Sequence, residues 1–340
     1  PIVPHRRLAR VWHQAVTRWR FMAVIVGLIL LWQAVQGINW TEVVQLLTAI
    51  DPRGLAAIGA CNLLMLPLMS MRWWLILIML GTPVKLLRVS FYRTAAGAVS
   101  YLTPGPHFGG EPVSVILLNI HHRIGLPIGA ASVGVDRLLE LTVSFAVLAM
   151  CVGCLSLELP DSAGGMGAVL AISVVLALCL TLLALLFGGK RPFSRVIHQL
   201  CAFTITTSGF GKKMKSFARF LKDSEDRALT MFVVHPFQFT CAILVSLAAW
   251  VAVFAELWLI SYVLGVTLTF MELAGLTAIA RLAFFTPLPA GLGVLELGLP
   301  WVTTSFGLGA ELGFSICLII RIRDLFISLI GGGFLMKYLT

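Results

Sequence analysis

Apolar runs long enough to cross a lipid bilayer dominate this sequence. A helix needs about 20 consecutive apolar residues to span the hydrocarbon core. Six runs meet this requirement, at about residues 21–38, 54–80, 128–153, 166–187, 236–264 and 312–336. Because backbone polar groups must be bonded internally in lipid, each run is expected to form an α-helix. The sequence therefore predicts an all-α polytopic membrane protein with about six full spans.

Charged residues are too scarce for a water-soluble protein of this length. They make up 12% of the chain, and 59% of the residues are hydrophobic, whereas soluble domains carry about 25% charged residues. This balance excludes a soluble enzyme, a DNA-binding domain and a disordered linker. The formal net charge of +10 then indicates basic loops on one side of a membrane, and no nucleic-acid partner is expected.

Two further apolar regions, at about residues 86–120 and 271–301, are interrupted near their centres by proline and glycine. Each half is too short to cross the bilayer alone. Each region is therefore expected to enter the membrane as a helical hairpin and to return to the same side. Non-helical backbone is tolerated at membrane depth only where protein or a water-filled cavity covers it. The sequence thus predicts two re-entrant helical hairpins in addition to the spans.

The basic residues agree with this topology. Five arginines precede the first span, and nine lysines and arginines lie in residues 188–230. If both hairpins are re-entrant, these clusters and Lys337 fall on one face, which the positive-inside rule assigns to the cytoplasm. Both termini are therefore predicted to be cytoplasmic, and residues 188–230 to form a cytoplasmic loop. The first run has no small-residue cleavage site, which favours an uncleaved span over a signal peptide.

The two broken regions resemble each other. Residues 103–111 read TPGPHFGGE and residues 286–296 read TPLPAGLGVLE, so both contain Thr-Pro-x-Pro, then glycines and then one glutamate. About 25 residues further on, each copy has arginine and aspartate inside a span, at 136–137 and at 321–324. The charge topology places the two copies in opposite orientations. Paired broken helices in inverted repeats are typical of transporters that bind substrate near the midplane, between the repeats.

Four segments follow from this repeat. Residues 1–53 hold the basic N-terminal segment and the first span, and residues 54–153 form repeat A, which is a span, a re-entrant hairpin and a span. Residues 154–235 hold a linking span and the basic cytoplasmic loop, and residues 236–340 form repeat B in the same order as repeat A. The predicted architecture therefore contains two inverted-topology repeats.

Turn-forming and charged residues of the repeats are the candidate substrate-binding residues. The N-terminus of a half-helix presents unpaired N–H groups and a positive dipole end, which suit a phosphate or another anion. Arginines hold anionic groups through bidentate contacts. The candidates are Thr103, Pro104, Gly109, Gly110, Glu111, Asp136, Arg137, Arg281, Thr286, Pro287, Gly291, Gly293, Glu296, Arg321, Arg323 and Asp324. Arg72 and Arg93 are expected to extend to an interface instead.

Covalent chemistry has no candidate residues in this sequence. The seven cysteines lie in apolar runs or in the basic loop, so no disulfide framework is expected. His121 and His122 are predicted to be an interfacial pair, and no metal site, cofactor or catalytic residue is expected. Neither broken region matches a nucleotide-binding loop. We therefore expect a protein that is not an enzyme, in which any uphill transport draws on a gradient.

These motifs resemble the lysylphosphatidylglycerol synthase transmembrane-region family, also called flippase-like, over about residues 20–336. The resemblance is carried by residues 72–74, 101–111, 135–139, 287–296 and 321–324. It implies two inverted repeats with re-entrant helices, in a domain that translocates aminoacylated phosphatidylglycerol in the larger synthases. Ser114 and Leu295 stand near places where members often carry a basic residue. The sequence given also lacks the soluble aminoacyl-transferase domain, so synthesis of the lipid is not expected.

The resemblance and the buried charges together favour a lipid flippase of a bacterial inner membrane. It would move an anionic or modified lipid between leaflets by alternating access, and relatives are linked to varied lipids that include hopanoids and polyprenyl carriers. Two alternatives stay open, which are an ion-coupled transporter of a small anionic solute and a membrane scaffold whose partner is a lipid-modifying enzyme. The broad apolar surface also allows a homodimer.

Overall fold

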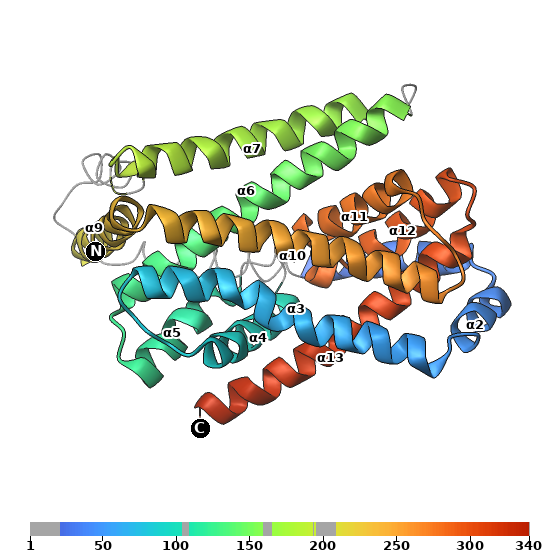
Figure 1. The fold of residues 1–340 in the computed structure, drawn as a ribbon, viewed down its shortest axis with the longest axis horizontal. Helices are drawn as coiled ribbons and strands as arrows, with labels where there is room; N and C mark the ends of the chain where they lie inside the picture. The colour runs from blue at the N-terminus through green and yellow to red at the C-terminus, as the bar shows by residue number, and fades with distance from the viewer. Residues whose placement is uncertain (1–20, 104–108, 159–164, 193, 195–208, 340) are drawn as a thin grey trace, which may run out of the picture. The chain divides into compact units, whose positions relative to one another are not determined.

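A computed structural model describes residues 21–103, 109–158, 165–192, 194 and 209–339. These residues are mainly helical and include no β-strand, so the all-α prediction is confirmed for them (Figure 1). The chain divides into two compact units. Unit 1 comprises residues 1–58, 97–110 and 256–332, and unit 2 comprises residues 59–96, 111–255 and 333–340.

Each of the six predicted spans coincides with a helix. These helices are Phe21–Gln36, α3 (Pro52–Met79), α6 (Leu126–Glu158), α7 (Gly165–Phe187), α10 (Pro236–Val263) and α13 (Ala310–Leu339). By length and hydropathy, three helices of the described chain, α3, α6 and α10, are able to cross a bilayer. Helix Phe21–Gln36 and α2 (Trp40–Thr48) together make a fourth candidate, bent by 86°. The described chain thus has three or four candidate spans by length and hydropathy, and the number six stays a prediction.

Both broken regions are pairs of short helices, as their proline and glycine residues predicted. Helices α4 (Leu86–Leu102) and α5 (Glu111–His122) flank the first break. Helices α11 (Phe270–Phe285) and α12 (Val294–Ser305) flank the second, with a 3₁₀ turn, η1 (Pro289–Gly291), between them. The breaks are confirmed, whereas the re-entrant path and the inverted repeat stay predictions.

The turn before α12 depends on glycine in unit 1. Gly293, which precedes α12, has φ +84°, a region that side chains with a Cβ rarely adopt. A Cβ built there would lie 2.4 Å from Cβ of Leu30 and 2.8 Å from the carbonyl oxygen of Gly27. Glycine therefore lets the start of α12 approach helix Phe21–Gln36 closely enough to pack against it.

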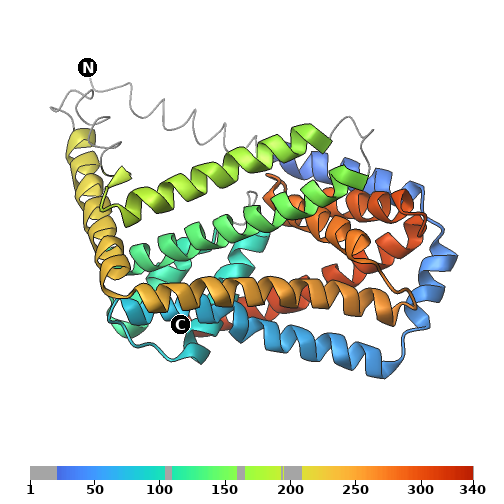
Figure 2. The same ribbon diagram turned by 45° about the horizontal axis from the view of Figure 1, so that its top comes forward.

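Unit 2 is built around α6. Helix α6 packs against α5, α7 and α9 (Gly209–Val234). Figure 2 shows α9 running across the ends of α6 and α7 rather than alongside them. A core of Ile76, Leu139, Met231 and Phe239 joins α3, α6, α9 and α10. Because Ile76 and Leu139 are neighbours in this core, the polar residues one turn away on α3 and α6 also face each other.

Helix α9 corrects one prediction. Residues 188–230 were expected to form a loop, but residues from Gly209 onward are helical. Ser224, Ala228 and Met231 are buried and repeat at the spacing of one helix face. The high density of lysine and arginine hides this pattern in the sequence, because solvated charges are equally typical of a loop.

Candidate functional site

A pair of carboxylates on α6 is the centre of the polar structure in unit 2. Asp136 and Glu140 are one helical turn apart and therefore share a face. Arg72 of α3 reaches both, with Nε 2.7 Å from Oδ1 of Asp136 and Nη2 2.9 Å from Oε2 of Glu140. The side chains of Arg72 and Asp136 are each only 7% exposed. Burial at this depth requires paired charges, because an isolated ion would lose its hydration without compensation.

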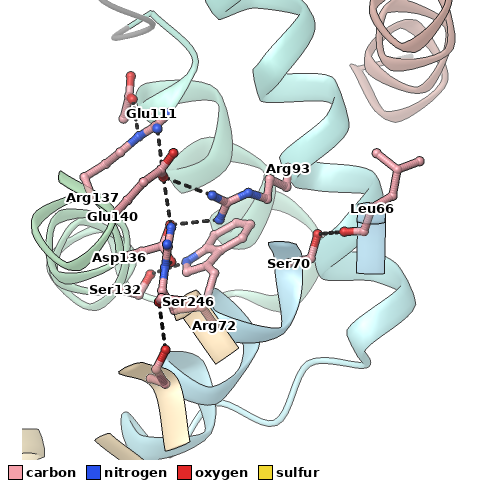
Figure 3. Close-up of polar contacts among 12 residues, drawn as sticks. Leu66, Ser70, Arg72, Arg93, Glu111, Ser132, Asp136, Arg137, Glu140 and Ser246 are labelled. Atoms are coloured by element: carbon pink, nitrogen blue, oxygen red, sulfur yellow. Dashed lines mark hydrogen bonds and ion pairs between the residues drawn. The ribbon is translucent and has the colours of Figure 1, made fainter. Parts of the chain in front are cut away.

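Two more arginines complete this cluster (Figure 3). Arg93 of α4 places Nη1 2.8 Å from Oδ2 of Asp136 and Nη2 3.0 Å from Oε2 of Glu140. Arg137 of α6 places Nη1 3.0 Å from the same oxygen of Glu140. One carboxylate oxygen thus accepts hydrogen bonds from three arginines. We call this cluster the unit 2 network; its members are Arg72, Arg93, Glu111, Asp136, Arg137 and Glu140.

Glu111 joins the network by charge rather than by a hydrogen bond. It begins α5, and its Oε1 lies 2.7 Å from Nε of Arg137. This oxygen accepts no hydrogen bond from any described residue. The side chains of Glu111 and Arg137 are 20% and 28% exposed. The network therefore has a closed side at Arg72 and Asp136 and a partly open side at Glu111 and Arg137.

A second network lies in unit 1, where Arg321 of α13 holds the turn of the second broken region. Its Nε lies 2.7 Å from Oε1 of Glu296. Its Nη1 and Nη2 donate to the carbonyl oxygens of Ala290 and Gly291 at 2.6 and 3.3 Å. Glu296 also accepts the N–H of Gly293 at 2.7 Å. The N-terminus of α12 therefore already holds a carboxylate of its own chain.

Arg323, two residues further along α13, lies between two carboxylates. Its Nη1 donates to Oε1 of Glu256 on α10. Its Nε and Nη2 both donate to Oδ1 of Asp324, at 2.9 and 2.8 Å. The other oxygen of Asp324, Oδ2, is buried and accepts no hydrogen bond from the described residues. We call Glu256, Glu296, Arg321, Arg323 and Asp324 the unit 1 network.

The two networks correspond in one respect and differ in another. In each, a glutamate at the start of a short helix pairs with an arginine further along the chain, as Glu296 does with Arg321, 25 residues away. On the preceding long helix the sign of the charge is exchanged: Arg72 stands on α3 and Glu256 on α10. The unit 2 network has three arginines and three carboxylates, whereas the unit 1 network has two arginines and three carboxylates.

The threonines of the Thr-Pro motifs cap helix ends. The hydroxyl of Thr103 donates to the carbonyl of Val99, and that of Thr286 donates to the carbonyl of Ala283 at 2.6 Å. Pro287 follows Thr286 directly and lies between α11 and η1. These hydroxyls are bonded to backbone, so the two threonines have the same local role in both copies.

The remaining candidates are spread around the two breaks. Pro104 lies outside the described residues. The N–H groups of Gly109 and Gly110 donate to the hydroxyl of Ser100 at 3.4 and 2.8 Å. Arg281 is half-buried on α11 and belongs to neither network as defined.

Arg72 and Arg93 overturn an expectation. They were expected to extend to an interface, but both donate to Asp136 and Glu140. That prediction is wrong because partners on another helix compensate the charges where they are. Glu140 and Glu256 were absent from the candidate set although they are central to their networks. The position of Glu140, one turn after Asp136 on an apolar helix, was the signal that could have identified it.

An aromatic and histidine cluster lies at the end of α5. The hydroxyl of Tyr92 is 3.1 Å from Nε2 of His122, and the ring of Tyr338 packs edge-on against His121. Burial lowers the pKa of His122, and the nearby charges of Arg88 and His121 lower it further. Among the described residues, no group of three or more His, Cys, Asp or Glu is arranged to hold a metal ion.

A family model described as the lysylphosphatidylglycerol synthase TM region matches residues 20–332. The chain therefore belongs to this family, as its motifs predicted. No curated protein and no solved structure matches the chain. Family membership and the apolar helices together identify a multi-pass membrane protein, consistent with a role connected to membrane lipids.

Proposed function

We propose that this member of the lysylphosphatidylglycerol synthase transmembrane family is a flippase that moves a lipid with an anionic headgroup between the leaflets of a bacterial inner membrane. The observation that carries the proposal is the partly open side of the unit 2 network. An arginine inside a membrane protein costs free energy unless its charge is paired or hydrated, and such residues typically mark a functional site. Here Arg93 and Arg137 remain 24% and 28% exposed although they are paired.

The headgroup would bind by taking the place of the Glu111 carboxylate beside Arg137. Arginine presents two parallel N–H groups that match the oxygens of a phosphate. Oε1 of Glu111 pairs with Arg137 by charge in a partly exposed position and accepts no hydrogen bond, so we expect a phosphate to compete with this carboxylate for Arg137. The first turn of α5, where Glu111 stands, adds the positive end of a helix dipole. Both features support a phosphate site next to Arg137.

The unit 1 network is less suited to this role. Glu296 already occupies the N-terminus of α12, and Arg321 is bonded to that glutamate and to two carbonyl groups. The side chains of Glu296 and Arg321 are 8% and 13% exposed. An incoming anion would have to displace a well-bonded carboxylate there. We therefore assign headgroup binding to unit 2 and a positioning role to Arg321.

Transport in this proposal involves no covalent step. The charged headgroup would exchange its hydration for the arginines while the acyl or prenyl tails remain in the bilayer. Alternating access of the site to the two leaflets would then complete the movement.

The test is lipid exchange in reconstituted vesicles. Fluorescent phosphatidylglycerol is incorporated into both leaflets, and a membrane-impermeant quencher reports how fast the inner label reaches the outer leaflet. Wild-type protein should accelerate this exchange. Arg137→Gln should slow it at least about tenfold, because a hydrogen bond to a charged group contributes about 1.5–3 kcal/mol. Glu111→Gln should retain exchange, because it keeps Arg137 and removes only the competing charge.

Arg191→Gln is the matched control. Arg191 also pairs with a carboxylate in unit 2, that of Asp226, but its side chain is 46% exposed and lies outside the network. It should leave the exchange rate unchanged. Exchange no faster than in protein-free vesicles, for phosphatidylglycerol, aminoacyl-phosphatidylglycerol and polyprenyl phosphate alike, would refute the proposal. Uptake of a water-soluble anion without lipid exchange would favour the small-solute transporter instead.

A further inference from the structure

Asp324 has one carboxylate oxygen that is buried without a hydrogen-bond donor among the described residues. Its Oδ1 accepts both Nε and Nη2 of Arg323. Its Oδ2 is buried and accepts no hydrogen bond from the described residues, and the whole side chain is 13% exposed. A buried carboxylate oxygen without a donor is unfavourable in its ionised form, because it loses hydration and gains nothing in return.

The charges of the unit 1 network point in the same direction. Arg323 serves both Glu256 and Asp324, and Arg321 serves Glu296. Two arginines thus pair with three carboxylates of this network. Glu256 is only 3% exposed and is bound by Arg323. One proton on Oδ2 of Asp324 would remove the charge from the oxygen that has no donor.

We infer that Asp324 is a proton-binding site that couples lipid movement to a proton gradient. Binding adds one proton to Oδ2 of the carboxylate, and release returns it to water. The coupling rests on the proposed lipid transport, whereas the proton binding does not. A proton fits better than a metal cation, which needs several oxygen ligands around one point, because Oδ1 is already covered by a guanidinium.

Asp324 lies on the same helix as the arginine that holds the turn of the second broken region. Arg321 stands one helical turn before Asp324, and it holds the carbonyls of Ala290 and Gly291. If Asp324 loses its negative charge, Glu256 becomes the one charged carboxylate that pairs with Arg323. The electrostatic attraction between Asp324 and Arg321 also becomes weaker. The charged and titratable groups around Asp324 are Arg321, Arg323 and Cys317 of α13, Glu256 of α10, Glu296 of α12 and Tyr101 of α4.

Infrared spectroscopy of the purified protein tests proton binding without any transport. A protonated carboxylic acid has a C=O stretching band that its carboxylate lacks. The chain has 15 aspartates and glutamates, and each one that is protonated contributes to the difference spectrum between acidic and alkaline pH. The band of Asp324 is the part of the wild-type difference spectrum that Asp324→Asn should lack. Asp324→Glu should shift its frequency, which covers the case in which the asparagine variant does not fold. Glu42→Gln, which removes an exposed carboxylate of unit 1, should leave the band unchanged.

A pH gradient across reconstituted vesicles tests the coupling. For one proton per lipid, one pH unit supports about a tenfold difference in labelled lipid between the leaflets. Wild-type protein should produce this imbalance. Asp324→Asn should lose the imbalance, because its amide takes up no proton.

The outcomes separate the two proposals. Difference spectra of the wild type and Asp324→Asn that are equal at every pH overturn proton binding at Asp324. An imbalance that persists in Asp324→Asn, or one driven by a sodium gradient instead of a pH gradient, overturns the proton coupling. Wild-type vesicles that exchange no lipid at all refute the proposed function and the coupling with it, while the infrared result decides proton binding by itself.

Discussion

Arg321 and Glu296 form an ion pair, 2.7 Å between Nε and Oε1, that fixes the turn leading into α12. The same guanidinium donates to the carbonyls of Ala290 and Gly291, and the same carboxylate accepts the N–H of Gly293. One pair of side chains thus satisfies backbone groups on both sides of the turn. This explains how a break inside an apolar region is stabilised.

Arg321→Lys tests this role of the pair. Lysine keeps the charge opposite Glu296, but its single ammonium group lacks the planar fork that reaches both carbonyls. The free energy of unfolding should therefore fall by about 1.5–3 kcal/mol, as for a lost hydrogen bond to a charged group. The melting temperature in detergent is the measurement. Arg53→Lys, at an exposed arginine of α3, should have the same melting temperature as the wild type. If Arg321→Lys also has the wild-type melting temperature, Arg321 does not stabilise the turn.

Gly293→Ala and Gly265→Ala form a matched pair. Both glycines have φ +84°, but a Cβ at Gly265 meets nothing within 4 Å, whereas one at Gly293 meets Leu30 at 2.4 Å. Gly265→Ala should lower the free energy of unfolding by about 1–2 kcal/mol through backbone strain alone. Gly293→Ala should be clearly less stable than Gly265→Ala, which thermal unfolding measures. Equal losses would show that α12 does not depend on close approach to helix Phe21–Gln36.

Asp136→Asn should be much more disruptive than Asp226→Asn, although both aspartates pair with arginine in unit 2. Asp136 is 7% exposed, and its loss leaves Arg72 and Arg93 sharing Glu140. A broken buried pair costs about 3–5 kcal/mol. Asp226 is 38% exposed, and surface pairs contribute at most about 1 kcal/mol. Thermal unfolding of the two variants is the measurement, and a similar loss in both would argue against a tightly paired unit 2 network.

His122 predicts a pH dependence of stability. Burial and the charges of Arg88 and His121 hold its folded-state pKa below the ordinary value of about 6.5. The unfolded state therefore binds the proton more readily, and stability is lost as the pH falls from about 6.5 toward the lower folded-state pKa. His122→Gln should reduce this loss. Melting temperatures compared across this pH range provide the test, and an unchanged slope would exclude His122 as a contributor.

Several features of the fold were predictable because they follow from local sequence. The apolar runs predicted the helices that the structure contains, since length and hydropathy act within one segment. Thr-Pro-x-Pro and glycine predicted both breaks, because two prolines close together remove backbone donors and adjacent glycines disfavour a continuous helix. Glu296 and Arg321 were both candidate residues, and the structure shows that they form a pair. Helix α9 was missed because its buried face is visible only against α6 and α7.

The sequence by itself determined that this chain is a helical membrane protein with two similar breaks and a few charges inside apolar segments. Only the tertiary structure decided which of those charges meet. Arg72 and Asp136 are 64 residues apart, and no local pattern states which faces of α3 and α6 are turned toward each other. Packing of Ile76 and Leu139 in one core decides it, because side chains one turn away on each helix must then share the same buried space.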